Sequence, residues 1–162
     1  MQNKTYFITS LFNEFILLVI ATQCLLKIAA LASGKDPKDL NKASKIFEEV
    51  AVQSLASRLG QYSAKGYLFQ ALLCHLASSD YVATQQKVDQ FKSLDYSFAS
   101  SRECDFIEKI LVALNNMDAA EFSKACADFD RISPLDPWKT SMLSQVLTTL
   151  KSAAGEDDVD LT

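Results

Sequence analysis

Glycine and proline are scarce in this chain, and that scarcity limits which folds it can adopt. The 162 residues include four glycines and three prolines. A β-sandwich or an α/β sheet of this length needs many tight turns, which these two residues usually make. Long helices with short connections need few, and the chain is rich in the helix-favouring residues alanine, leucine, lysine, glutamate and glutamine. The sequence therefore predicts an all-α protein whose length suits one domain with a real core.

Apolar residues recur at helical spacing in consecutive pairs of segments. The predicted pairs are 39–56 with 61–77, 80–94 with 100–116, and 118–133 with 136–152. Gly60 marks the join within the first pair. Ser100 or Ser101 is placed to cap the second helix of the second pair. Asp136 followed by Pro137 is a strong helix start, with the aspartate as the cap and the proline at the first helical position.

The first segment of each pair closes on the same aromatic motif. The three copies are Phe47-x-x-Val50, Phe91-x-x-Leu94 and Phe129-x-x-Ile132. One aromatic residue in each unit can fill the gap between neighbouring hairpins, as a stacked α-solenoid requires. A leading half unit, the helix around residues 21–33, precedes the three pairs. The expected fold is thus a right-handed α-solenoid of hairpins that resemble tetratricopeptide repeats and end in a small helical bundle.

The amino-terminal region contains an unbroken apolar run at residues 15–20, and its apolar character continues beyond that run. Glu14 abuts the run and Lys27 lies among the polar residues that interrupt its continuation. The uninterrupted stretch is therefore shorter than the roughly 18–20 residues of a membrane span. A buried or partner-covered helix is expected here, with a membrane-anchored helix within residues 5–32 as the alternative.

We therefore divide the chain into three parts. They are an apolar amino-terminal segment at 1–20, a helical-repeat domain at 21–153 and an acidic tail at 154–162.

The net charge of −4 lies entirely in the tail. Glu156, Asp157, Asp158 and Asp160 are four of the twenty acidic residues, so sixteen acids remain against sixteen bases in the rest of the chain. A neutral body with an acidic tail argues against nucleic acid as the main partner. The tail either has a function of its own or serves solubility.

Four basic residues recur at an almost constant interval. Lys27, Lys65, Arg102 and Lys139, which we call the basic row, are separated by 38, 37 and 37 residues. Each falls near the start of the second helix of a unit, or in the leading half unit. Equivalent positions stack into a column in a regular solenoid, and a column of bases suits an elongated acidic partner. Scattered solvated charge is the alternative explanation.

The residues that usually carry enzyme chemistry form no recognisable site. The four cysteines, at positions 24, 74, 104 and 126, match no zinc or redox spacing and are predicted to be free, buried thiols in a reducing compartment. His75, the only histidine, points away from the adjacent Cys74 on a helix and is predicted to be structural. The isolated glycines form no phosphate-binding loop. We expect no catalytic residue, metal or cofactor.

Two other candidates for a site have simpler structural explanations. The neighbouring acids Glu48 and Glu49 are predicted to lie on a solvated helix face. Trp138, the only tryptophan, is predicted to be a packing anchor for the final helical pair.

Several stretches resemble one known family in order and spacing. They are QCLLKIAA (23–30), KASKIFEEVAVQSL (42–55), YSAKGYLFQALLCHL (62–76), FASSRECDFIEKIL (98–111), FDRISPLDPWKTSML (129–143) and the ending EDDVDLT. Together they resemble the carboxy-terminal half of the soluble NSF attachment proteins of the alpha-SNAP type. Residues 1–20 are expected to lack a counterpart in that family.

The resemblance implies a non-enzymatic adaptor. Family members bind the four-helix SNARE complex and recruit and stimulate the hexameric ATPase NSF, which separates the SNAREs after vesicle fusion. The resemblance places Lys27, Lys65 and Arg102 at SNARE-gripping positions, whereas Lys139 belongs to the row by spacing alone. It also implies that Asp157, Asp158, Asp160 and Leu161 contact NSF.

The implied location is cytoplasmic and peripheral, on the cytosolic face of vesicle and target membranes, with membrane contact through SNAREs. The alternative functions are a generic helical-repeat module that binds another protein and a membrane-anchored helical protein.

Overall fold

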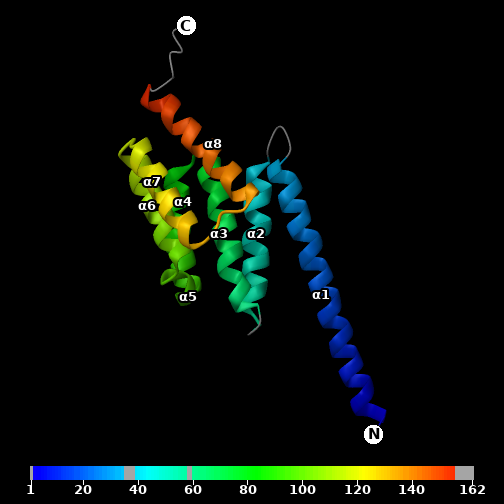
Figure 1. The fold of residues 1–162 in the computed structure, drawn as a ribbon. Coiled ribbons are helices and arrows are strands. Elements are labelled where there is room, and N and C mark those ends of the chain that lie inside the picture. Colours follow the sequence, from blue (N-terminus) through cyan, green and yellow to red (C-terminus); the bar gives the residue numbers. More distant parts are fainter. Residues whose placement is uncertain (1, 35–38, 58–59, 156–162) are drawn as a thin grey trace.

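The described part of the chain is built from stacked helices. The computed structural model describes all residues except 1, 35–38, 58–59 and 156–162, and for residues 2–15 we consider the backbone alone. The described residues contain no strand, and their helices are α1 (Gln2–Gly34), α2 (Leu40–Leu55), α3 (Gln61–Ala77), α4 (Tyr81–Leu94), α5 (Tyr96–Ala99), α6 (Arg102–Asn115), α7 (Ala119–Ile132) and α8 (Pro137–Ala154). This all-α helical-repeat fold (Figure 1) confirms the predicted class.

The helix boundaries follow local signals in the sequence. The predicted caps Ser101 and Asp136 accept hydrogen bonds from the backbone amides of Cys104 (3.2 Å) and Lys139 (2.9 Å). Side-chain caps satisfy backbone amides that have no partner inside the helix. The short helix α5 was not predicted. It begins at Asp95, whose carboxylate accepts a hydrogen bond from the amide of Ser97.

Helix α3 lies at the centre of the core. It packs against α2, α4, α6 and α8, and its side chains from Ala71 to Cys74 are all completely buried. Phe69 of α3 meets Phe106 of α6 and Phe129 of α7, with ring centroids 6.0 and 5.6 Å apart. These aromatic contacts join three successive units, since α3, α6 and α7 come from different hairpins.

The packing role predicted for the phenylalanines of the aromatic motif is confirmed. Phe47 and Phe91 are buried, and Phe129 is half-buried against its two aromatic neighbours. At the second position of the motif Val50 is buried, whereas Leu94 and Ile132 are exposed. Both are the last residue of their helix, where the chain turns away from the core.

Trp138 anchors a different part of the molecule from the one predicted. Its indole Nε1 donates a hydrogen bond to Ser33 Oγ of α1 (2.8 Å), and its ring meets Phe47 of α2 at 5.6 Å. Ser33 is fully buried and donates in turn to the carbonyl of Ala29. Trp138 therefore ties the start of α8 to the first two helices.

A charged cluster joins α2, α3 and α4. Glu48 lies 2.8 Å from His75 Nε2 and accepts a 2.6 Å hydrogen bond from Lys87 Nζ. Burial alone would raise the pKa of Glu48, but the contacts with His75 and Lys87 outweigh it and lower that pKa. The structural role of His75 is confirmed. The prediction of a solvated face is wrong for Glu48, which is partly buried, and holds for the exposed Glu49.

Helix α1 departs most from expectation. It runs without interruption through residue 20, and its amino-terminal half extends away from the other helices (Figure 1). Residues 16–20 are exposed, so the expectation of a helix buried within this chain is wrong, and the alternative of a partner-covered helix stays a prediction. Cys24 on the same helix is also exposed, whereas Cys74 and Cys104 are buried as predicted, and all four thiols are free.

Candidate partner-binding surface

The four members of the basic row lie on four helices that occupy equivalent places in the repeat. Lys27 is exposed in α1, and Lys65 is half-buried in the first turns of α3. Arg102 is the exposed first residue of α6, and Lys139 is half-buried in the first turn of α8.

Lys65 and Arg102 occupy matching positions on neighbouring helices. Lys65 precedes Phe69 by four residues, and Arg102 precedes Phe106 by four. Residues four apart lie on the same side of a helix, one turn from each other. Since the rings of Phe69 and Phe106 meet at 6.0 Å, the two bases lie one turn away from the contact between α3 and α6. This geometry supports a column for these two residues.

Lys139 lines a cavity of about 210 Å³ that also includes Phe69 of α3. Its lining comes from α3, the start of α6 and the connection between α7 and α8: Gly66, Tyr67, Phe69, Gln70, Glu103, Phe129, Ser133, Pro134 and Lys139. Arg102 Nη1 donates to Ser133 Oγ at 3.4 Å, so this arginine reaches the wall of the cavity. The structure thus places Lys139 in the lining of this depression and Arg102 in contact with its wall, whereas Lys65 does not line it.

Local ion pairs distinguish the members of the row. Lys139 Nζ lies 2.8 Å from the carboxylate of Asp136. Burial acts to raise the pKa of Asp136, but the hydrogen bonds from Lys139 outweigh it and lower that pKa. Among the residues that the structure describes, Lys27, Lys65 and Arg102 have no acidic partner. Their charge is therefore available to a partner protein, whereas that of Lys139 is largely neutralised.

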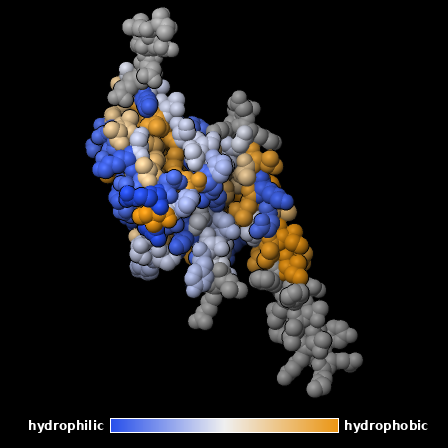
Figure 2. Space-filling model, viewed as in Figure 1, coloured by the Kyte–Doolittle hydropathy of each residue, from blue (hydrophilic) through white to orange (hydrophobic). Residues whose placement is uncertain are grey.

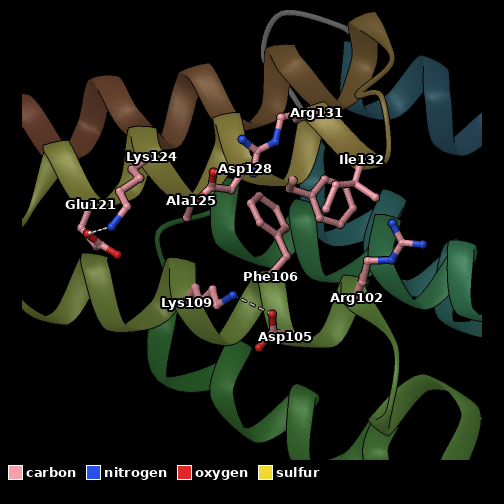
Figure 3. A pocket seen from close by; sticks show the side chains of 11 residues that line it. Arg102, Asp105, Phe106, Lys109, Glu121, Lys124, Ala125, Asp128, Arg131 and Ile132 are labelled. Atoms are coloured by element: carbon pink, nitrogen blue, oxygen red, sulfur yellow. Dashed lines mark ion pairs between the residues drawn. The ribbon is translucent and has the colours of Figure 1, made fainter.

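The groove between α6 and α7 (Figure 3) also contains both bases that are paired with acids and one base that is not. It has a volume of about 390 Å³ and an apolar floor that includes Phe106 and Phe129. Three bases on its rim are paired with acids of their own helix: Lys109 with Asp105 (2.8 Å), Lys124 with Glu121 (3.5 Å) and Arg131 with Asp128 (3.5 Å). Arg102, the remaining base of the lining, contacts only the Ser133 hydroxyl in the described structure.

Lys27 of α1 lies next in sequence to a residue that lines a second cavity. This cavity, of about 320 Å³, is lined by Leu26, Ala30, Phe47, Tyr67, Gln70, Asp136 and Trp138. Tyr67 and Gln70 line both cavities, so the two depressions adjoin across α3. Lys27 follows Leu26 in the chain but does not line this second cavity, so no contact joins Lys27 to Arg102 or Lys139 in the described structure.

Comparison with known proteins identifies the fold as that of a specific family. The family described as "Soluble NSF attachment protein, SNAP" matches residues 11–151. The chain belongs to this family. The match begins at residue 11, so the expectation that residues 1–20 lack a counterpart in the family is wrong for residues 11–20. Helix α1 also crosses residue 20 as one helix. The boundaries of the three proposed parts stay predictions.

Individual relatives agree with the family match. The chain is 38% identical over 132 residues to an alpha-soluble NSF attachment protein of Dictyostelium discoideum, a match that covers 82% of this chain and 45% of the relative. It is 35% identical over 141 residues to a beta-soluble NSF attachment protein of Bos taurus (87% and 46%). It is 32% identical over 143 residues to a vesicular-fusion protein of Komagataella phaffii (88% and 48%). The chain thus spans a little under half the length of these relatives.

The remaining predicted site lies outside the described residues. Asp157, Asp158, Asp160 and Leu161, predicted from the family resemblance to contact NSF, are all in the undescribed segment 156–162. Within the described ranges, no group of three or more histidine, cysteine, aspartate or glutamate side chains could hold a metal ion.

Sequence reasoning missed two features of the surface. The pairing of Asp136 with Lys139 could have been found, because acids and bases three residues apart are neighbours on a helix. No pattern in the sequence indicates that Tyr67 and Gln70 line two cavities, because this depends on how α1, α6 and α8 surround α3. The first feature changes the assessment of the row, because Asp136 compensates the charge of Lys139.

Proposed function

We propose that this chain is a non-enzymatic adaptor that binds SNARE complexes and recruits and stimulates the ATPase NSF during vesicle fusion and intracellular transport. The observation that carries this proposal is the position of Lys65 and Arg102 on matching turns of adjacent helices, each without an acidic partner in the described structure. Membership of the SNAP family supports the identity of the partners, because relatives carry names that refer to NSF attachment and vesicular fusion.

The basic row suits an elongated acidic partner on physical grounds. Adjacent packed helices lie about 8–10 Å apart, so unpaired bases on successive helices present charge at regular intervals along the stack. A bundle of parallel helices with acidic side chains can meet several of these bases at once. Such contacts steer association and set orientation, and salt weakens them. Lys139 would contribute less than Lys65 and Arg102 because Asp136 already compensates its charge.

Within this proposal the chain supplies binding and NSF supplies ATP hydrolysis. The adaptor works in the cytoplasm, on the cytosolic face of vesicle and target membranes, where assembled SNAREs are found. The row on α3 and α6 is proposed to hold a SNARE complex even though the chain spans less than half the length of its relatives. A generic helical-repeat module is the competing function, and it predicts no preference for SNAREs or NSF.

A pull-down experiment separates these two functions. We expect the immobilised chain to retain an assembled four-helix SNARE complex at low salt and to retain NSF only when that complex is present. An acidic four-helix protein of unrelated sequence serves as the control for nonspecific charge attraction. Equal retention of the control bundle and the SNARE complex, or no dependence of NSF on the complex, would contradict the proposal.

The tail is proposed to dock on NSF through Asp157, Asp158 and Asp160, while Leu161 enters an apolar pocket. Burying one leucine contributes roughly 1.5–3 kcal/mol. We therefore expect Leu161→Ala to leave SNARE retention unchanged and to reduce stimulation of NSF ATPase activity about tenfold or more at a subsaturating adaptor concentration. Neutralising the three aspartates together should instead weaken docking in a salt-sensitive manner.

The measurement is the NSF ATPase rate against adaptor concentration with saturating SNARE complex. Val159→Ala is the matched control, because it shortens an apolar side chain of the same tail at a position given no role. If the chain stimulates NSF and Leu161→Ala stimulates it equally well, the proposed role of this leucine is wrong.

A further inference from the structure

Residues 16–20 of α1 have an apolar surface that the adaptor function does not use. We propose that this part of α1 inserts into a lipid bilayer. The proposal is independent of the proposed adaptor function and adds a direct membrane contact to the indirect contact through SNAREs expected from the sequence.

Five successive apolar side chains of α1 are exposed. Ile16, Leu17, Leu18, Val19 and Ile20 have between 39% and 66% of their surface accessible. Figure 2 shows a band of apolar surface on this part of the helix. A contiguous apolar patch of this kind normally marks an interface, because water contact with it is unfavourable.

The distribution of these apolar side chains around the axis of α1 indicates the kind of partner. An α-helix has 3.6 residues per turn, so five consecutive residues surround its whole circumference. A helix that docks in a protein groove, or under one further hairpin, has one apolar side and one polar side. An apolar surface on every side is typical of a helix enclosed by lipid.

Charge and hydropathy agree with a lipid environment. Glu14 is the only charged residue between Lys4 and Lys27. The stretch Ile16–Gly34 has a mean hydropathy of 2.1, which meets the usual level for a membrane-crossing helix, and only 17% of it is buried in the protein. A buried core helix of a soluble protein with the same composition would be mostly covered.

The attachment of α1 to the body limits which part can enter the bilayer. Ala29, Ala32 and Ser33 are buried, and Ser33 is hydrogen-bonded to Trp138. A full crossing by Ile16–Gly34 would break that attachment. The part before it is less restricted, because Leu18 and Val19 face the body only across a cavity of about 240 Å³.

The length of the projecting helix is sufficient for insertion. Residues 5–20 extend about 24 Å at 1.5 Å per residue, against a hydrocarbon core of about 30 Å. Insertion of this segment enters most of the core without requiring α2 or α3 to leave the aqueous phase. The body then rests at the bilayer surface near Thr22 and Gln23, which also line this cavity.

Flotation with phosphatidylcholine vesicles tests this insertion. We expect the full chain to float with the vesicles and the double variant Leu17→Glu/Leu18→Glu to remain with the unbound protein. Each carboxylate placed in the hydrocarbon core should lower the bound-to-free ratio by more than about tenfold. Val82→Glu/Val112→Glu is the matched control, because both valines are exposed apolar residues of the body. This control should float like the unmodified chain.

A fluorescent probe reports depth along the helix. Leu17→Cys and Leu31→Cys are labelled with an environment-sensitive dye after Cys24 and Cys126 are changed to serine, which leaves the buried Cys74 and Cys104. Vesicles should shift the emission of the dye to shorter wavelength at position 17, and lipid-borne quenchers should reduce it. The dye at position 31, which is exposed but belongs to the attached end of α1, should change little.

Several outcomes would overturn the insertion. They include failure of the unmodified chain to float, flotation that is equal in the Leu17→Glu/Leu18→Glu variant, and equal emission shifts at positions 17 and 31. If the unmodified chain fails to float and sedimentation without lipid shows an oligomer that the same double variant makes monomeric, then a second copy of the chain covers α1. SNARE retention without lipid should be unaffected by this variant, so failure of the insertion is distinguishable from failure of the adaptor function.

Discussion

Helices α1 and α3 each contain a run of consecutive apolar residues, yet they lie in opposite environments. In α3 the run from Ala71 to Cys74 is completely buried, because four helices surround it. In α1 the run from Ile16 to Ile20 is exposed, because this helix packs mainly along α2 and only near its carboxyl end reaches Trp138. A continuous apolar run therefore shows that a helix needs an apolar environment on all sides, but it does not show what supplies that environment.

Thiol chemistry offers the most sensitive test of this difference. Burial raises the pKa of the Cys74 thiol in α3 to about 12, so about one thiol in 10⁴ is ionised at pH 8. Cys24 in α1 is exposed. We expect a maleimide to modify Cys24 at least about a thousandfold faster than Cys74 in the folded protein. Peptide mass spectrometry over time measures both rates, and comparable rates under native conditions would show that α3 is not enclosed.

The same substitution in the two helices should have very different effects on stability. Leu72→Ala in α3 removes a completely buried side chain and should lower the free energy of unfolding by about 2–5 kcal/mol. Leu18→Ala in α1 removes a largely exposed one and should change it by less than about 0.5 kcal/mol in lipid-free solution. Urea unfolding followed by circular dichroism measures both. A large loss from Leu18→Ala would mean that the amino-terminal half of α1 is part of the cooperative core.

The charged cluster of Glu48, His75 and Lys87 predicts a pH-dependent contribution to the free energy of unfolding. The pKa of Glu48 lies below its ordinary value of 4.5 in the folded state. Its ionised form therefore stabilises the protein above pH 4.5, and this contribution is lost as the pH falls through the folded-state pKa. We expect Glu48→Gln to lower the free energy of unfolding by about 1 kcal/mol at pH 7, because Glu48 is partly exposed. This cost should decrease as the pH falls below 4.5.

Unfolding by urea at several pH values measures this dependence. Glu49→Gln is the matched control, because its side chain is adjacent but exposed. An equal cost for Glu48→Gln at pH 3 and pH 7 would contradict a contribution from the ionised carboxylate.

The fold could largely be predicted from the sequence because its signals are local. The caps Ser101 and Asp136, together with apolar spacing, determined the helical hairpins to within about two residues at most ends. The bond from Trp138 to Ser33 joins residues 105 positions apart, and no local pattern indicates it. No local pattern decides between a buried and a partner-covered α1 either, since burial depends on which other helices are present.

The candidate surface was predictable only in part. The interval between the basic residues identified Lys65 and Arg102, whose helices the structure places side by side through Phe69 and Phe106. The interval could not show that Asp136 compensates Lys139 or that Lys27 lies beside a separate cavity. Spacing identifies equivalent positions in a repeat, whereas the availability of a charge depends on its neighbours in space.

Charge reversal at Lys65 and Arg102 tests the central claim most directly. We expect Lys65→Glu/Arg102→Glu to weaken binding of the SNARE complex about tenfold or more at low salt, through lost attraction and new repulsion. The matched control is Lys42→Glu/Lys45→Glu, because both lysines are exposed on α2 and lack an acidic partner among the described residues. Titration calorimetry at two salt concentrations measures both affinities, with circular dichroism to verify folding. The predicted result is weakened binding in Lys65→Glu/Arg102→Glu alone. Equal affinities of the two folded variants would contradict a SNARE-binding role for Lys65 and Arg102.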